Sequence, residues 1–497
     1  LLSSKYMAAD LAADLDKLLA ALGGAWLVLT LLRRATASRE AAAVADGSAA
    51  PSDTAEALRR LQWQYLPAWL LFKAADWMQG PYFHEVYASK RHVATGEPFS
   101  DTDVSRLFLA GFVAATLVGT AAGSLVDSRG RRAGCVLYAA AAGAAAASVV
   151  CERPELLLAG RVVGGIGTSL LAAAPEAWLC AEHARLSLPA ASLGGIFGWA
   201  YFGDSLVAIA SGQVASRAAS AGGPQAPFLA SLPLLAAGAA IASATWRENR
   251  GGKGGGGGGG GLREGASILL RRPDLLSLMA VQALFEASMY IFVLVFAPAI
   301  VAAAPAAARE GLPFGKVFSC FMAACAVGSA TFSLCSAKGL RAEAFLLPVL
   351  LGAAGALYLA SSPPAATMLQ RALSMSHKPL YLVFCFAAFE AAVGVYFPAV
   401  GGLRAAYLPG AQRGAIMALT RVPLNLLVIA VALARDRLGD TGALRCAAAA
   451  QLLAAAALAS LWARGGAAGK GEAPAAKDKG LAASPAMSTL SRAKKAD

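Results

Sequence analysis

The stretch that decides the fold is GSLVDSRGRR, residues 123–132, which lies between two long apolar runs. Gly123 permits the close approach of a second helix, and Gly130 permits a tight turn. Asp127 falls at the end of a predicted helix, where its carboxylate can accept hydrogen bonds from the N-terminus of a neighbouring helix. Arg131 and Arg132 add positive charge, which is typical of loops on the cytoplasmic side of a membrane. We therefore predict a cytoplasmic connection between two membrane helices.

The composition supports a membrane protein. Of the 497 residues, 57% are hydrophobic and only 15% are charged, whereas soluble domains average about 25% charged residues. A membrane-spanning helix needs about 20 apolar residues. The chain offers twelve such segments, near 63–88, 104–126, 133–151, 159–179, 188–215, 226–246, 275–301, 313–336, 343–361, 379–402, 412–434 and 441–463.

These segments divide into two sets of six, because a glycine-rich basic stretch separates the sixth from the seventh. Glycine runs form flexible tethers. An additional apolar run, 18–32, is followed by Arg33 and Arg34, which favours a membrane helix with its C-terminal end inside over a signal peptide. The predicted parts are an N-terminal apolar helix and cytoplasmic linker (1–62), a six-helix bundle (63–246), a cytoplasmic linker (247–272), a second six-helix bundle (273–463) and a disordered basic tail (464–497).

Several classes of function are excluded. The formal net charge of +13 comes from loops and tails between apolar runs, so it does not indicate nucleic-acid binding. The eight cysteines form no CxxC pair, and we expect neither a metal site nor a cofactor. No nucleophile–base pair or phosphate-binding loop is visible, which argues against an enzyme.

The pattern G-x-L-x-D-x-x-G-R-R in 123–132 resembles the signature loop of the major facilitator superfamily. It follows the second of twelve spans, where that superfamily carries it, and the six-plus-six division agrees. The resemblance implies an all-α membrane protein whose two bundles rock around a site near the membrane midplane. The corresponding loop of the second half, 333–343, keeps only Lys338, Gly339 and Arg341 as faint echoes.

Ionisable side chains inside membrane spans are costly, and by default they face a cavity or each other. At 1.5 Å per residue, five of them fall in the middle of the bilayer, at depths of ~14 to ~21 Å: Asp76, Asp204, Glu286, Glu390 and Arg421. Glu176 falls near a cytoplasmic end. We interpret Glu176 and the four acids of the list as coupling or gating residues. For each of these five acids, the alternative of a purely structural intramembrane pair or gate latch stays open.

The same helices carry candidates for substrate binding. Arg161 lies in GRVVGGIG, whose glycines admit a neighbouring helix. Arg421 and Lys73 are further cations in predicted spans. A few polar or aromatic groups on apolar walls are typical of a binding cavity, and the residues of this kind beside the charges are Trp77, Gln79, Tyr82, Gln282, Tyr396 and Asn425.

Blocks in both halves resemble one branch of the superfamily, the molybdate-anion transporter family of eukaryotes. They include ADWMQGPY (75–82), EAWLCAEH (176–183) and QALFEA (282–287). The resemblance implies uptake of molybdate, a tetrahedral dianion, across the plasma membrane. Arginine offers a fixed fork of N–H donors to an oxyanion, and the buried carboxylates are candidates to carry co-transported protons.

Two alternatives remain at this level. One is a transporter of the same fold for another small solute, such as sulfate, a sugar, or a drug exchanged for protons. The other is a membrane sensor that transports nothing. The expected partners are therefore a small inorganic anion, protons and the lipid bilayer, with no nucleic acid.

Overall fold

The computed structural model describes residues 2–44, 52–250, 262–306, 309, 311–338, 340–362, 378–408 and 413–468. Within these ranges the chain is almost entirely helical, and the β-type pairing is a single bridge between Arg91 and Pro98. Nine of the described helices are long and apolar enough to cross a membrane. The all-α membrane fold predicted from the sequence is confirmed.

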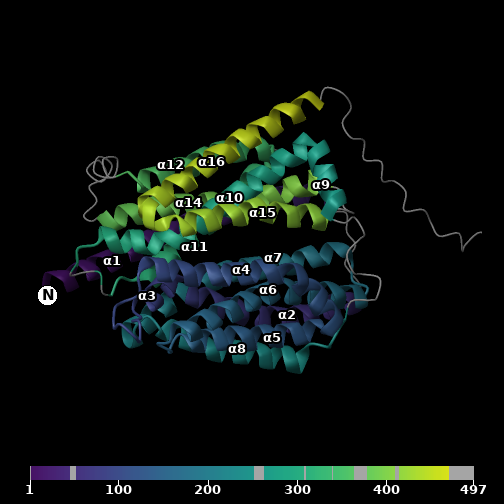
Figure 1. Cartoon of the computed structure of the whole chain (residues 1–497). Helices are drawn as coiled ribbons and strands as arrows, with labels where there is room; N and C mark the ends of the chain where they lie inside the picture. Colours follow the sequence, from purple (N-terminus) through teal and green to yellow (C-terminus); the bar gives the residue numbers. More distant parts are fainter. Residues whose placement is uncertain are drawn as a thin grey trace, which may run out of the picture.

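Twelve long helices form two bundles (Figure 1). The N half contains α2 (Ser52–Gln79), α4 (Asp101–Arg129), α5 (Arg131–Ser148), α6 (Pro154–Arg185), α7 (Ala190–Gly222) and α8 (Ala226–Thr245). The short helices η1 (Gly80–Tyr82) and α3 (Phe83–Ala88) continue α2. The C half contains α10 (Pro273–Ala303), α11 (Phe314–Ala337), α12 (Ala342–Ala360), α14 (Lys378–Tyr407), α15 (Arg413–Leu433) and α16 (Arg435–Ala468).

The two halves repeat one packing pattern. In the N half, α2 packs against α7 and α8, while α6 packs against α4 and α5. In the C half, α10 packs against α15 and α16, while α14 packs against α11 and α12. Each helix of the first set thus has its counterpart six spans later, and the predicted pair of six-helix bundles is confirmed.

Glycines make close helix contacts at equivalent places in both halves. A Cβ added at Gly165 of α6 would collide with the carbonyl oxygen of Gly111 on α4. Likewise, side chains at Gly328 of α11 and Gly394 of α14 would collide with the carbonyls of Ala391 and Cys325. Small residues allow membrane helices to approach closely and gain van der Waals contact, which explains the glycine content of these spans.

The halves meet along a seam made by two helix pairs, α7 with α11 and α4 with α15 (Figure 1). We call the end of the molecule that carries residues 123–132 the inner end and the opposite one the outer end. At the outer end, Gly212 lies against Gly315, and the hydroxyl of Tyr82 accepts from the Gly315 amide at 3.4 Å. Arg435 of α16 reaches Asp101 of α4 at 3.7 Å. The outer end of the seam is therefore closed.

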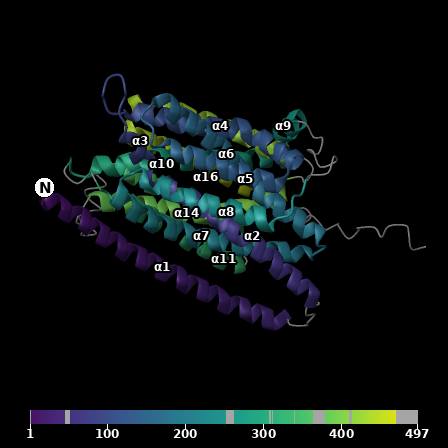
Figure 2. The same cartoon turned by 90° about the horizontal axis from the view of Figure 1, so that it is seen from below.

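An additional helix, α1 (Leu2–Val44), runs along one side of the molecule beside α11 and α7 (Figure 2). It contains a candidate membrane span, Asp10–Arg33. Leu11 and Leu15 are buried, and the Lys316 Nζ of α11 lies 2.6 Å from the Asp16 carboxylate. The predicted additional N-terminal helix is present, and it packs mainly on the C half.

The boundaries of the connecting segments differ from the prediction. Helix continues through Val44 and resumes at Ser52, so much of the predicted linker between the apolar run 18–32 and residue 63 is helical. The predicted linker 247–272 ends in helix α9 (Leu262–Arg271), which packs on α15. Ile268 and Leu269 are partly buried against the core, whereas Leu270 is exposed. Residues 251–261 and 469–497, on which the flexible tether and the disordered tail were predicted, lie outside the described residues.

Candidate functional site

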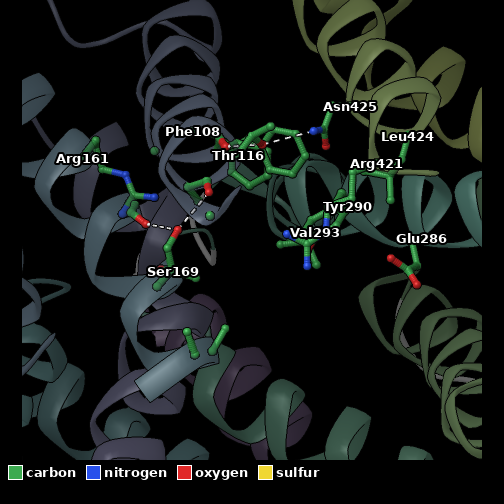
Figure 3. Close-up of a pocket in the computed structure, with 18 residues that line it drawn as sticks. Phe108, Thr116, Arg161, Ser169, Glu286, Tyr290, Val293, Arg421, Leu424 and Asn425 are labelled. Carbon is green, nitrogen blue, oxygen red and sulfur yellow. Dashed lines mark hydrogen bonds between the residues drawn. The ribbon is translucent and has the colours of Figure 1, made fainter. Parts of the chain in front are cut away.

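A cavity of about 490 Å³ lies between the two halves. Helices α4 and α6 supply one wall, and α10 and α15 supply the other (Figure 3). Pockets for small ligands typically measure about 300–1,000 Å³ and combine apolar walls with a few polar groups. The polar and aromatic lining residues are Phe108, Phe112, Thr116, Arg161, Thr168, Ser169, Glu286, Tyr290, Arg421 and Asn425.

Arg161 enters the cavity from α6. Its Nε donates to the carbonyl oxygen of Leu107 at 3.4 Å, and its guanidinium lies 4.6 Å from the centre of the Phe83 ring. A side chain at Gly111 would come within 2.7 Å of the Arg161 Nη2, so the glycine makes room for the guanidinium. The side chain is thus positioned by a carbonyl and a ring, and no carboxylate of the described residues pairs with it.

Arg421 and Asn425 enter from the opposite half, one turn apart on α15. Arg421 is exposed to the cavity and forms no ion pair with the described residues. A Cβ added at Gly119 of α4 would lie 3.5 Å from its Nη1, so this arginine also reaches the facing half. Asn425 donates from Nδ2 to the hydroxyl of Thr116 at 3.2 Å, which forms a hydrogen bond across the seam (Figure 3).

Glu286 of α10 contributes the carboxylate of the lining (Figure 3). The hydroxyl of Tyr396 donates to it at 3.4 Å, and the Tyr396 ring stacks on Phe285 at 3.7 Å. Tyr396 is buried behind Glu286 and does not line the cavity. Gln282, one turn before Glu286, is likewise buried outside the lining.

A second group of charges lies outside the cavity. We call it the α2–α7 cluster: Lys73, Asp76, Trp77 and Asp204. The Lys73 Nζ lies 3.7 Å from the Asp204 carboxylate, 4.0 Å from the Asp76 carboxylate and 4.4 Å from the centre of the Trp77 ring. The Trp77 indole donates to Asp204 at 2.7 Å, and its ring packs on Phe318 of α11. The structure supports the alternative of an intramembrane pair for these residues.

The remaining candidates are dispersed. Gln79 donates to Ser231 at 3.0 Å and joins α2 to α8. Tyr82 is part of the closed outer seam. Glu176 accepts from the Tyr201 hydroxyl at 3.1 Å, between α6 and α7. Glu390 is buried in α14, and none of these four residues lines the cavity.

The signature loop binds an unexpected partner. Asp127, near the end of α4, pairs with Arg131, the first residue of α5, at 2.7 Å. The capping role of Asp127 stays a prediction, and a different carboxylate caps α5. The carboxylate at the N-terminus of α5 is Glu248, which accepts from the amides of Arg132 and Ala133 at 3.0 Å each. Such a position is favoured by the helix dipole.

Gly130 explains why this carboxylate fits. Its φ of 124° is a backbone conformation that side chains disfavour, and a Cβ there would lie 2.5 Å from Glu248. The Arg132 guanidinium lies 3.6 Å from the same carboxylate. Gly123 lies within α4, and its surroundings are outside the described part of the structure.

Sequence analysis missed the hydroxyls and aromatic walls of the cavity, which include Phe108, Phe112, Tyr290 and Ser169. Ser169 donates to the Ala115 carbonyl at 2.8 Å (Figure 3), and Phe112 meets Tyr290 edge-on across the seam at 5.0 Å. The described residues contain no group of three or more His, Cys, Asp or Glu side chains that could hold a metal. The chemistry of the cavity is therefore that of a binding site with two guanidiniums and one carboxylate.

Two repeated six-helix bundles with a polar cavity at their seam define a transporter of the major facilitator class. The chain matches the family described as sugar transporters with twelve transmembrane helices over residues 33–389. Among solved structures it is similar to the nucleoside transporter NupG, with 10% identity, a TM-score of 0.58, and coverage of 83% of this chain and 99% of that one.

Comparison with curated relatives narrows the family within this class. The chain is 31% identical to the molybdate-anion transporter of Xenopus tropicalis over 374 residues, 75% of this chain and 78% of the relative. It is 30% identical to the molybdate-anion transporter of Danio rerio over 404 residues, which again cover 75% of this chain and 78% of the relative. The chain belongs to the molybdate-anion transporter family of the major facilitator superfamily. It is a multi-pass membrane transporter and not an enzyme.

Proposed function

We propose that the protein takes up molybdate by alternating access through the cavity between α4, α6, α10 and α15. Arg161 and Arg421 are the proposed substrate donors, and Asn425 is a neutral contact beside them. The observation that carries the proposal is the pair of guanidiniums, one from each half, without a carboxylate partner among the described residues. In a cavity of low dielectric, charge-assisted hydrogen bonds to an oxyanion are strong and frequently bidentate.

The relatives support this substrate, because both are named molybdate-anion transporters. A sugar is the second candidate, since the family description refers to sugars and aromatic rings line the cavity. The charges decide between them. With a neutral sugar, two guanidiniums would face one carboxylate and leave an excess positive charge, whereas a dianion balances both guanidiniums when Glu286 carries a proton.

Alternating access follows from the geometry of the seam. The outer end is closed by contacts between α7 and α11 and between α4 and α16. We propose that the bundles 63–246 and 273–463 move as two bodies, and that this structure corresponds to the state in which the cavity serves the inner side. The plasma membrane is the proposed location, to be tested by surface labelling of the tagged protein.

We further propose that Glu286 carries a co-transported proton. It is the carboxylate of the cavity lining, and it lies among the arginines that would hold the anion. Molybdate entry into a negative-inside cell is opposed by about 2.3 kcal/mol per charge per 100 mV, so coupling would offset this opposition. In Glu286→Gln, molybdate uptake should no longer respond to a proton gradient, while exchange of internal for external molybdate continues. Unchanged gradient dependence would remove Glu286 from the coupling.

The main test measures molybdate accumulation by mass spectrometry in cells that lack their own transporter, with and without a proton gradient. We expect saturable uptake that tungstate competes for and a neutral sugar does not. Competition by sulfate at equal concentration would widen the substrate to tetrahedral dianions. Saturable uptake of a sugar without uptake of molybdate would overturn the proposal.

A further inference from the structure

A second cavity lies at the outer end, where α1, α7 and α11 meet. Its volume is about 520 Å³. Arg217 and Gln213 of α7, Lys316 of α11 and Asp16 of α1 line it, together with serine hydroxyls of α7. It shares no lining residue with the cavity between α4 and α15.

The charges of this cavity leave an excess of positive charge. Lys316 is paired with Asp16 at 2.6 Å. Arg217 is exposed and forms no ion pair with the described residues. Two cations therefore face one carboxylate. The excess charge of Arg217 makes the electrostatic potential in the cavity positive, which raises the local concentration of anions.

An unsatisfied donor lies beside these charges. The Gln213 side-chain nitrogen is buried and has no hydrogen-bond partner among the described residues. A buried donor without a partner costs about 1–3 kcal/mol. Rotation of the Gln213 amide into the cavity would let an oxyanion accept from it as well as from the guanidinium of Arg217, and this hydrogen bond would remove that cost.

The cavity borders the closed part of the seam. Gly212 precedes Gln213 and lies against Gly315, the residue before Lys316. Ser319 of α11 donates to the Ile209 carbonyl of α7 at 2.8 Å just below. Arg217 and Lys316 thus belong to opposite halves, at the point where α7 and α11 must separate when the outer end opens.

We propose that this outer cavity is a recruitment site for a tetrahedral oxyanion, occupied before the seam opens. The inference rests on the proposed function, in which the outer end faces the medium that supplies the anion. The same chemistry fits a free oxyanion or the phosphate of a lipid headgroup, because both present oxygens to Arg217 and the Gln213 amide.

The test uses the full chain in proteoliposomes and measures the KM and maximal rate of molybdate uptake. Arg217→Gln and Lys316→Gln should each raise the KM about threefold to tenfold and leave the maximal rate unchanged. Asp16→Asn should lower the KM, because it removes the acid that competes with the anion. Arg106→Gln, an arginine at the outer end of α4 that is 71% exposed and outside the cavity, is the matched control and should leave the KM unchanged.

The opposite signs expected for Lys316→Gln and Asp16→Asn separate a binding site from a structural ion pair. If both variants raise the KM and lower the thermal stability together, the pair is only structural and the proposal is overturned. An unchanged KM in Arg217→Gln also overturns it, even when the wild type takes up molybdate. If the wild type does not take up molybdate at all, the proposed function is contradicted. That outcome differs from an unchanged KM in Arg217→Gln, which contradicts only the recruitment site.

The lipid composition identifies the source of the anion. Vesicles of neutral phosphatidylcholine are compared with vesicles that contain phosphatidic acid. A wild-type KM that rises with phosphatidic acid, and does not rise in Arg217→Gln, would show that a lipid phosphate occupies the oxyanion site. A KM independent of the lipid, with the variant effects above, would assign the site to the free anion.

Discussion

Two groups of charges lie deep within the helices of this protein, and they differ in how they are satisfied. In the α2–α7 cluster, Lys73 has two carboxylates within 4.0 Å, and Asp204 also accepts from an indole. In the cavity between α4 and α15, Arg161 and Arg421 have no carboxylate partner among the described residues. Burying a charge is costly unless it is paired. We infer that the paired cluster stabilises its own bundle, and we propose that the two unpaired arginines bind the substrate.

The largest effect should come from Arg421→Gln, which removes one of the two guanidiniums offered to the anion. Loss of charge-assisted hydrogen bonds worth about 1.5–3 kcal/mol predicts a loss of roughly 10- to 100-fold in kcat/KM for molybdate, enough to abolish saturable uptake in a cell assay. Membrane insertion should be normal, because the Arg421 side chain forms no ion pair with the described residues. Arg421→Lys keeps the charge without the fork and should be intermediate. Normal kinetics in Arg421→Gln would exclude it from the site.

The reverse pattern is expected in the α2–α7 cluster. Lys73→Met leaves two carboxylates without their cation and should destabilise the protein by about 3–5 kcal/mol. The loss would be measured as a lower melting temperature of the purified protein in detergent. The double variant with Asp204→Asn should recover part of the stability, because one of the two carboxylates that Lys73 contacts is then neutral. Normal stability with abolished uptake in Lys73→Met would place Lys73 at the substrate.

The smallest effect tests the link between the two walls of the cavity. Thr116→Val removes the hydroxyl that Asn425 binds across the seam. Loss of a hydrogen bond worth about 1 kcal/mol should shift the balance between the two states about fivefold away from this one. Spin labels at the inner ends of α6 and α14 would report the shift as a change in distance distribution. Thr168→Val is the matched control, since that hydroxyl binds its own helix at Gly164; an equal shift in both variants would contradict the prediction.

Counting residues along a helix predicts a depth in the bilayer for each of these charges. The sequence does not predict the face of the helix on which each charged side chain lies. Glu286 and Glu390 were placed at similar depths, yet Glu286 lines the cavity and Glu390 is buried in α14. Rotation about the helix axis depends on packing, such as the stack of Phe285 on Tyr396, and helices apolar on every side carry little periodic signal.

The aromatic walls were missed for the same reason. Phe108 and Tyr290 occur in apolar spans where an aromatic side chain usually belongs to the core, so nothing in the sequence distinguishes them. The ion pair of Glu248 could be predicted in part from the sequence. It is an acid among the arginines that directly follow α8, and a lone carboxylate beside a basic loop indicates an ion pair.

The position of α1 has a consequence for the assembly of the molecule. This helix precedes the N half in the chain, but its buried leucines and its Asp16 belong to contacts with α11 of the C half. Trp26 also stacks on Phe202 of α7 at 5.8 Å, so the helix touches both bundles. In addition to the contacts along the seam, the two bundles are joined by the glycine-rich connection and by α1. Severing the peptide within the glycine run should yield two polypeptides that still associate as one particle.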